Sequence, residues 1–269
     1  MLDPDAFDAL LDRDPDAAVT LLVEMGKATD EGLRAAARAL ARRIVLDVSR
    51  RGSAQRPGVH RLRLVRADAG GDLDLEASLP ALVEARAGGH APHPEDLVAR
   101  GWSRPDLAVC LLVDASGSMS GARLAAAALT AGACTWRAPA DHAVLSFAKT
   151  VTRVRDMGSD QRPGPVVDAV LALRGHGVTG LAGALRAATE QLSRSRAARK
   201  VTVLLSDCRA TDDEDPVPAA LRVPELLVVA PAADTEQAEE LARRTGARWT
   251  GLTGPADAPA ALARLLDDV

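Results

Sequence analysis

Continuous apolar runs, each about as long as one strand, constrain the fold of this chain more than any other feature of its sequence. Three of them lie at Leu107–Val113, Val201–Leu205 and Leu226–Ala230. A strand without alternating polar residues is buried on both faces, as in parallel sheets that helices cover. Helical patterns separate these runs, which is typical of α/β proteins. We therefore expect an α/β fold with a doubly wound, mostly parallel sheet and helices on both faces.

The other predicted elements of this α/β region complete the alternation. Two short strands, Ala143–Phe147 and Val151–Arg155, are joined by a tight turn and predict a hairpin at an edge of the sheet. Helices are predicted over residues 123–134, 165–173, 181–193 and 257–268. A further helix is expected to be capped by Asp234 and to end at Gly246.

The first hundred residues follow a different pattern. Asp-Pro pairs at residues 3–4 and 14–15 predict helix starts, and a third helix after Asp30 places an apolar face along Leu33, Ala37, Leu40, Ile44 and Val48. A short strand over 59–66, a strand and helix within 73–86 and a turn-rich linker at 87–94 follow. We place a boundary near residues 95–105. Residues 1–100 are then a mainly helical accessory region, and residues 101–269 are the α/β domain.

Composition excludes several classes of function. Aromatic residues make up 2% of the 269 residues, Tyr is absent, and the net charge is −4. Binding of nucleic acid by base stacking or by a basic surface is therefore not expected. Residues 34–66 nevertheless carry ten Arg, which form either a solvated helix face followed by a basic loop or a surface that docks on a partner or on the α/β domain.

The sequence also indicates the cellular compartment of the protein. The chain begins with Met-Leu-Asp-Pro-Asp, which is acidic where a signal peptide is basic, and no apolar run approaches the ~20 residues that span a bilayer. Cys110, Cys134 and Cys208 show no metal-binding spacing and suit reduced thiols. We expect a cytoplasmic protein without a membrane association.

The residues that carry chemistry follow the first apolar strand. Asp114, Ser116 and Ser118 are each two residues apart, and Gly117 lies between the two serines. Ligands bind beyond the carboxyl ends of strands in open α/β sheets. A carboxylate and two hydroxyls are hard oxygen donors, which suit Mg²⁺ or a similar cation. The sequence therefore predicts a metal site at this edge.

This segment resembles the Asp-x-Ser-x-Ser signature of the metal-ion-dependent adhesion site in von Willebrand factor A-type (VWA) domains. Two later segments, Gly-His-Gly-Val-Thr-Gly-Leu at 175–181 and Leu-Leu-Ser-Asp-Cys-Arg-Ala-Thr at 204–211, resemble the threonine loop and the strand-ending Asp segment of that family. The resemblance covers roughly residues 106–268. It implies a six-stranded sheet with one antiparallel edge strand. It also implies that Mg²⁺ or Mn²⁺ is bound by Asp114, Ser116, Ser118, Thr179 and Asp207.

The sequence departs from the family pattern at Cys208, where the family usually has Gly. We interpret Cys208 either as an inert small residue or as a thiol that senses oxidation. The acidic run at 212–215 is either a solvated turn or a feature that guards the metal site or attracts a basic partner surface.

The predicted site favours binding over catalysis. Hydroxyls with two carboxylates leave a divalent cation incompletely satisfied, so it can accept a carboxylate from a protein partner. Asp114 and Asp207 would be engaged by the metal, and no nucleophile–base arrangement has a recognisable spacing, so we do not expect an enzyme. The chain resembles intracellular bacterial VWA proteins, which include chelatase subunits and proteins paired with MoxR-type AAA+ ATPases.

Three functions follow from this resemblance. The first is a metal-dependent adaptor that works with a MoxR-type ATPase, which must be a separate chain because no GxxxxGK[ST] loop is present. The second is an accessory subunit of a magnesium or cobalt chelatase. The third is a stand-alone ligand-binding module.

Overall fold

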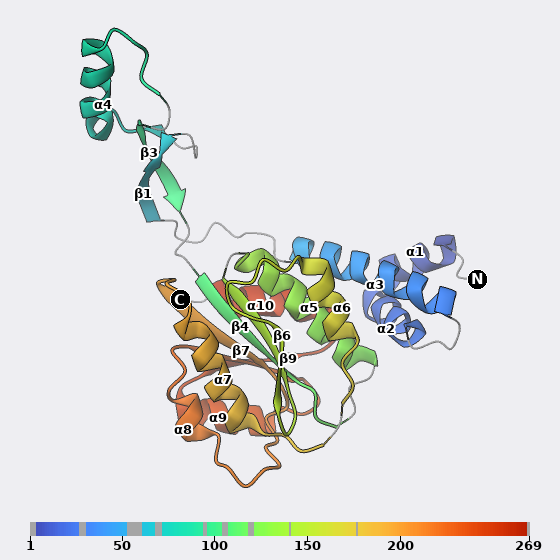
Figure 1. The fold of residues 1–269 in the computed structure, drawn as a ribbon. Coiled ribbons are helices and arrows are strands. Elements are labelled where there is room, and N and C mark those ends of the chain that lie inside the picture. The colour runs from blue at the N-terminus through green and yellow to red at the C-terminus, as the bar shows by residue number, and fades with distance from the viewer. Residues whose placement is uncertain are drawn as a thin grey trace. The chain divides into compact units, whose positions relative to one another are not determined.

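The computed structural model describes residues 4–26, 31–52, 61–67, 72–93, 96–103, 107–117, 121–139, 141–175 and 177–267 (Figure 1). The chain divides into two compact units. Unit 1 joins Met1–Ala54 to Leu107–Val269, and unit 2 consists of Gln55–Asp106. All five predicted metal ligands belong to the chain segments of unit 1.

A six-stranded sheet forms the centre of unit 1. The strand order is β6-β5-β4-β7-β8-β9, and every neighbouring pair is parallel except β5 and β6. The strands are β4 (Leu107–Asp114), β5 (His142–Phe147), β6 (Val151–Arg155), β7 (Arg199–Leu205), β8 (Leu226–Pro231) and β9 (Arg248–Leu252). The predicted mostly parallel sheet and its antiparallel edge strand are confirmed.

Helices cover both faces of this sheet (Figure 1). Side chains of β4 alternate between two cores, with Val109, Leu111 and Val113 on one side and Ala108, Cys110 and Leu112 on the other. The first side is covered by α5 (Gly121–Arg137), α6 (Pro163–Leu171) and α10 (Ala258–Asp267), and the second by α7 (Leu181–Ser193), α8 (Val217–Ala220) and α9 (Glu236–Thr245). Burial on both sides explains why the strand is apolar throughout.

One helix start differs from the prediction. α9 begins at Glu236 with Thr235 in the N-cap position, so Asp234 does not cap it. Asp234 instead accepts hydrogen bonds from the Arg209 guanidinium at 3.0 and 2.7 Å, and these bonds lower the pKa of its carboxyl group. The helix does end at Gly246, whose φ of 73° is the left-handed conformation that glycine adopts most easily.

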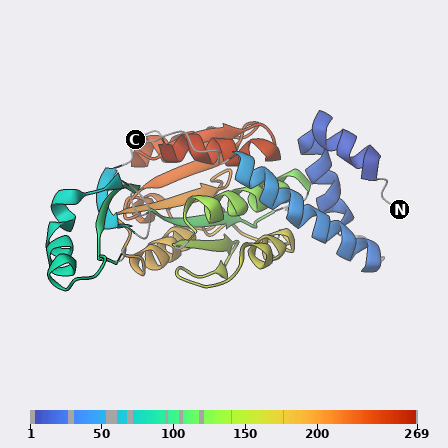
Figure 2. The same ribbon diagram turned by 90° about the horizontal axis from the view of Figure 1, so that it is seen from above.

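The amino-terminal helices of unit 1 pack on α5. They are α1 (Pro4–Arg13), α2 (Pro15–Met25) and α3 (Glu31–Gly52). α3 buries Ala41, Val45 and Ser49 against α5, slightly offset from the predicted apolar face (Figure 2). The Ser49 hydroxyl donates to the Leu129 carbonyl at 2.9 Å. α5 therefore lies between the sheet and α3, which explains its Ala-rich, almost wholly buried sequence.

Gly132 of α5 permits this close packing. A Cβ atom at Gly132 would lie 2.5 Å from Ser49 Oγ and 3.0 Å from Ser49 Cβ. The contact places the first 54 residues in the same compact unit as the α/β sheet. We predicted that residues 1–100 form one accessory region, but the two units divide these residues between them. The reason is that the amino-terminal helices share a core with helices that are distant in sequence.

Unit 2 is a small α/β unit with β1 (Arg61–Arg66), β2 (Asp72–Leu73), α4 (Leu75–Ala87) and β3 (Val98–Ser103). β3 pairs antiparallel with both β1 and β2 in the order β1-β3-β2. The Ser78 side chain joins α4 to β3 by hydrogen bonds with the main chain of Val98 at 3.0 and 2.9 Å. β3 was not predicted and lies within the proposed boundary at residues 95–105.

Among the helices that the structure describes, none combines the length and the apolar character that crossing a membrane requires.

Candidate metal centre

Asp114 ends β4 with both carboxylate oxygens already engaged by neighbouring hydroxyls. Oδ1 accepts from Ser116 Oγ at 2.5 Å and from the Ser116 amide at 2.9 Å, and Oδ2 accepts from Ser206 Oγ at 2.5 Å. Gly117 follows with a φ of +59°, which lets the chain turn away from the strand. A hydroxyl that donates its proton to a carboxylate keeps its lone pairs for another partner. Ser116 can therefore serve as a neutral oxygen donor, whereas the Ser206 hydroxyl also accepts from the Cys208 amide at 2.9 Å.

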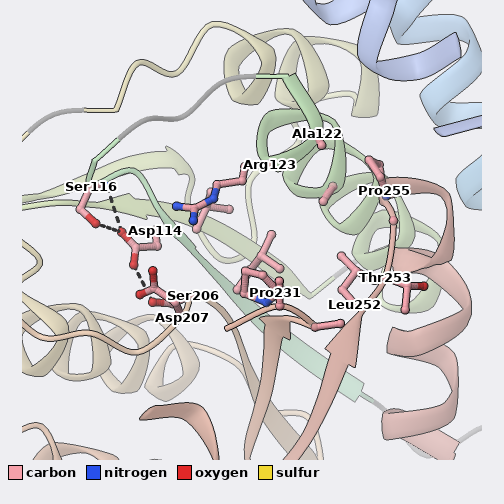
Figure 3. Close-up of a pocket in the computed structure, with 16 residues that line it drawn as sticks. Asp114, Ser116, Ala122, Arg123, Ser206, Asp207, Pro231, Leu252, Thr253 and Pro255 are labelled. Atoms are coloured by element: carbon pink, nitrogen blue, oxygen red, sulfur yellow. Dashed lines mark hydrogen bonds between the residues drawn. The ribbon is translucent and has the colours of Figure 1, made fainter. Parts of the chain in front are cut away.

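Asp207 lies beside Asp114 because β7 is the parallel neighbour of β4. Asp114, Ser116, Ser206 and Asp207 line one end of the same pocket (Figure 3). Asp207 Oδ1 accepts from the Arg209 amide at 3.0 Å, which fixes the turn after the strand. The register of two parallel strands thus brings together carboxylates 93 residues apart in sequence.

Thr179 lies in the loop before α7 and is 4% exposed. Its amide donates to Thr211 Oγ1 at 2.7 Å, and the Thr211 amide donates back to the Thr179 carbonyl at 3.2 Å. The threonine loop is thereby joined to the loop that follows Asp207. Thr179 is not among the residues that line the pocket. Its place as a ligand stays a prediction.

Ser118, the remaining predicted ligand, lies outside the residues that the structure describes. The structure therefore places Asp114, Ser116 and Asp207 at one pocket end and Thr179 on the adjoining loop. Within the described part of the chain, no group of three or more His, Cys, Asp and Glu residues could hold a metal ion. A cation at this edge depends on hydroxyl oxygens in addition to the two carboxylates, and Mg²⁺ and Mn²⁺ accept such donors.

Cys208 has a φ of +61°, and among the described residues it is the one non-glycine residue with a positive φ. This conformation costs a side chain about 1 kcal/mol, and it is the one that glycine would adopt freely. Burial raises the pKa of the Cys208 thiol to about 12, with further contributions from the charges of Asp207 and Asp114. A buried, protonated thiol favours the inert interpretation of this residue.

The acidic run after Cys208 is tied to neighbouring helices. Glu214 forms an ion pair with Arg186 of α7, and Asp215 forms one with Arg244 of α9 at 2.9 Å. Asp215 also accepts from the Val217 amide at 3.1 Å. Arginine side chains of the same chain therefore neutralise part of the negative charge of the acidic run, as is typical of a turn with a structural role.

Ser206 belongs to the site, and Glu24 contacts the helix that follows the site; the sequence singled out neither. Ser206 stands directly before Asp207, so the hydroxyl at a strand end was a usable signal. Glu24 of α2 accepts from the amide of Gly121, the first residue of α5, at 2.7 Å. Nothing local could indicate this contact, because it spans 97 residues.

Family comparison identifies the type of domain that carries this site. The chain matches the family described as "VWA domain containing CoxE-like protein" over residues 36–250. The chain belongs to this family. The CoxE-like match begins within α3 and includes unit 2, so it extends beyond the region of the predicted VWA resemblance.

Solved structures share the fold of this CoxE-like protein at low sequence identity. An aerotolerance-related membrane protein from Bacteroides fragilis is 14% identical, with a TM-score of 0.50 over 61% of this chain and 100% of that one. BatB from Bacteroides thetaiotaomicron is 13% identical, with a TM-score of 0.50 over 60% of this chain and 97% of that one. A search of curated proteins gave no match. These likenesses support the VWA fold alone.

Proposed function

We propose that this CoxE-like protein is an adaptor that captures an acidic residue of a partner protein through a bound Mg²⁺ or Mn²⁺ ion. Asp114, Ser116, Ser118, Thr179 and Asp207 would hold the cation, directly or through water. The observation that carries the proposal is the arrangement of Asp114, whose two oxygens accept hydrogen bonds from the hydroxyls of Ser116 and Ser206. These bonds orient the carboxylate and leave hydroxyl lone pairs for a cation.

The unfilled coordination position explains why such a site would bind a carboxylate. Two aspartates balance the two positive charges of the ion, but the hydroxyl donors add no charge, and the coordination shell is left incomplete. When bound, the cation supplies an electrophilic position that an incoming carboxylate can fill. The chain's own part is to hold this edge rigid. The hydrogen bonds between the loops of Thr179 and Thr211 serve that purpose.

We further propose that the protein catalyses no reaction and works in the cytoplasm with a separate MoxR-type AAA+ ATPase. Membership of the CoxE-like family supports the ATPase, because the chain resembles intracellular bacterial VWA proteins that are paired with such ATPases. Cys110, Cys134 and Cys208 are buried free thiols, which suits a reducing compartment. Both aspartates of the pocket would be occupied by the cation, which leaves no free acid–base pair there.

Calorimetry tests the metal site directly. Wild-type protein should bind one Mg²⁺ or Mn²⁺ ion, and Asp114→Ala should abolish that binding. Asp72→Ala, which removes an exposed carboxylate of unit 2, is the matched control and should leave binding unchanged. An absence of metal binding by wild type, or unchanged binding by Asp114→Ala, would refute the proposal.

Partner capture is tested in native lysate with Mg²⁺ and with EDTA. Asp114→Ala and Thr179→Ala should abolish capture while leaving the fold largely intact, because Asp114 is the last residue of β4 and Thr179 lies in the loop before α7. Mass spectrometry should identify an AAA+ ATPase or its client among the captured proteins. Capture that persists undiminished in EDTA would show that the metal has at most a structural role.

A further inference from the structure

The pocket that contains the metal-site carboxylates is larger than a single carboxylate needs. Its volume is about 380 Å³. That value lies within the range of roughly 300–1,000 Å³ that small-molecule pockets occupy. From Asp114 and Asp207 it extends past the carboxyl ends of β8 and β9 to η2 (Pro255–Asp257) (Figure 3). The space beyond the carboxylates is therefore available to a second group of a bound ligand.

The two ends of this pocket differ in chemistry. Asp114, Ser116 and Asp207 form the polar end, whereas the far end is walled mainly by apolar side chains such as Pro231, Leu252 and Pro255 (Figure 3). Ala126 of α5 contributes a small side chain to the lining. A ligand that fills the pocket thus needs a carboxylate at one end and a large apolar group at the other.

Among the described residues that line the pocket, Arg123 is the one with a positively charged side chain. Its guanidinium projects towards Asp114 in Figure 3, between the polar end and the α5 helix. Opposite charge draws a negatively charged ligand towards this side of the pocket. Arg123 therefore favours the same ligand class as the metal end does.

The apolar end is held in place by α2. Asp16 accepts from the Ala256 amide at 2.6 Å, and its carboxylate lies so close to Gly254 that any side chain there would collide with it. Eight residues further along α2, Glu24 holds the start of α5 on the other side of the pocket. A pocket fixed at both rims is pre-formed, which lowers the free-energy cost of ordering it on binding.

We propose that this pocket is a specificity subsite for a peptide segment in which a carboxylate lies next to one large apolar side chain, such as Phe or Leu. The carboxylate occupies the metal end, and the apolar side chain occupies the space bounded by Leu252 and Pro255. This inference rests on the proposed function and narrows its partner class. The carboxylate can come from an internal Asp or Glu or from a chain end with an apolar last residue.

Short fluorescent peptides in Mg²⁺ test this subsite on the full-length chain. The set compares terminally blocked peptides centred on Asp-Phe, Asp-Ala and Asn-Phe, and a peptide ending in Phe with a free carboxyl group. Anisotropy should show that Asp-Phe binds about 10-fold or more tightly than Asp-Ala, since burying a Phe side chain is worth at least that much. Asn-Phe should bind weakly. Tight binding of the Phe-terminated peptide would assign the carboxylate to a chain end.

Two pocket-filling variants, Ala126→Leu and Ala233→Leu, should bring the Asp-Phe to Asp-Ala ratio close to one. Both residues line the pocket, and Ala233 is exposed, so its substitution leaves the core untouched. Calorimetry on the same samples should show unchanged Mg²⁺ affinity.

The outcomes separate the two proposals. Mg²⁺ binding with equal affinity for Asp-Phe and Asp-Ala, or without any peptide binding, would overturn the subsite and leave the metal centre standing. Asp-Phe binding that is equally strong in EDTA would also overturn it, because the two ends would not act together. A failure of wild type to bind Mg²⁺ would refute the metal centre itself, and the subsite with it.

Discussion

Helices α3 and α4 both precede the central sheet in sequence, and the fold uses them in opposite ways. α3 buries Val45 and Ser49 completely against α5. α4 instead leaves Leu75, Leu79 and Val83 exposed at 63%, 56% and 60%. Those three residues are four apart and share one face of the helix. An apolar stripe in the sequence of a helix thus indicates that the helix has an apolar face. It does not indicate whether another part of the same chain covers that face.

The difference arises from the surface available to each helix. α5 offers α3 a row of small residues, including Ala128 and Gly132, so the two backbones approach closely. α4 packs by its other side, where Ser78 and Ala85 are buried. In the described part of unit 2, a three-stranded sheet covers that buried side. Substitutions on α3 and α4 should therefore have very different energies.

The largest expected effect is that of Val45→Ala. Val45 is fully buried, and the change removes two methyl groups and leaves a cavity between α3 and α5. We expect a loss of about 2 kcal/mol in the free energy of unfolding, measured by urea denaturation. The matched control is Val83→Ala on α4, which should cost less than about 0.5 kcal/mol. Equal losses would show that the two helices are covered to the same extent.

A pair of glycines tests the close approach of α3 and α5. Gly132→Ala should destabilise by about 1–2 kcal/mol, because the new Cβ collides with the fully buried Ser49. Gly183→Ala on α7 is the control, since the nearest contact of its Cβ would be Arg186 Nη2 at 3.9 Å. Replacing Gly by Ala in a helix is otherwise favourable by about 1 kcal/mol. The two variants should shift the urea midpoint in opposite directions, and a shared direction would contradict the packing.

The contrast between α3 and α4 also explains which structural features could be predicted from the sequence. Local patterns were predictable, whereas contacts between distant segments were not. The run at β4 was apolar because both faces of the sheet are covered, so the central sheet and the position of Asp114 could be predicted from local pattern. Ser206 could have been found, because it directly precedes Asp207. The contact of Glu24 with Gly121 could not, because it depends on which surface α2 packs against. β3 was missed because Val98–Ser103 includes Arg100 and Gly101, which weaken its strand pattern.

A smaller effect is expected where α2 contacts the start of α5, the helix that contributes Ala122, Arg123 and Ala126 to the pocket. Glu24→Ala removes the acceptor for the Gly121 amide and a favourable negative charge at the start of α5. We expect a loss of about 1 kcal/mol in metal binding, which is roughly a 5-fold weaker Mg²⁺ affinity by calorimetry. Glu24→Gln keeps an acceptor oxygen and should recover part of this affinity. If Glu24→Ala lowers stability but leaves Mg²⁺ affinity unchanged, α2 supports the fold without positioning the site.

The smallest expected effect is at the exposed face of α4. Leu79→Gln replaces an apolar side chain that is 56% exposed with a polar one of similar helix propensity. We expect the free energy of unfolding to change by less than about 0.5 kcal/mol, because little apolar area is removed from water at this position. Ala85→Gln on the buried side of the same helix is the control, and it should cost more than about 1 kcal/mol, since it forces a long polar side chain into a site that is 3% exposed. Both changes are measured by urea denaturation of the full chain, with circular dichroism as the probe. A loss at Leu79 as large as the loss at Ala85 would mean that both sides of α4 are covered in solution, and the contrast with α3 would then fail.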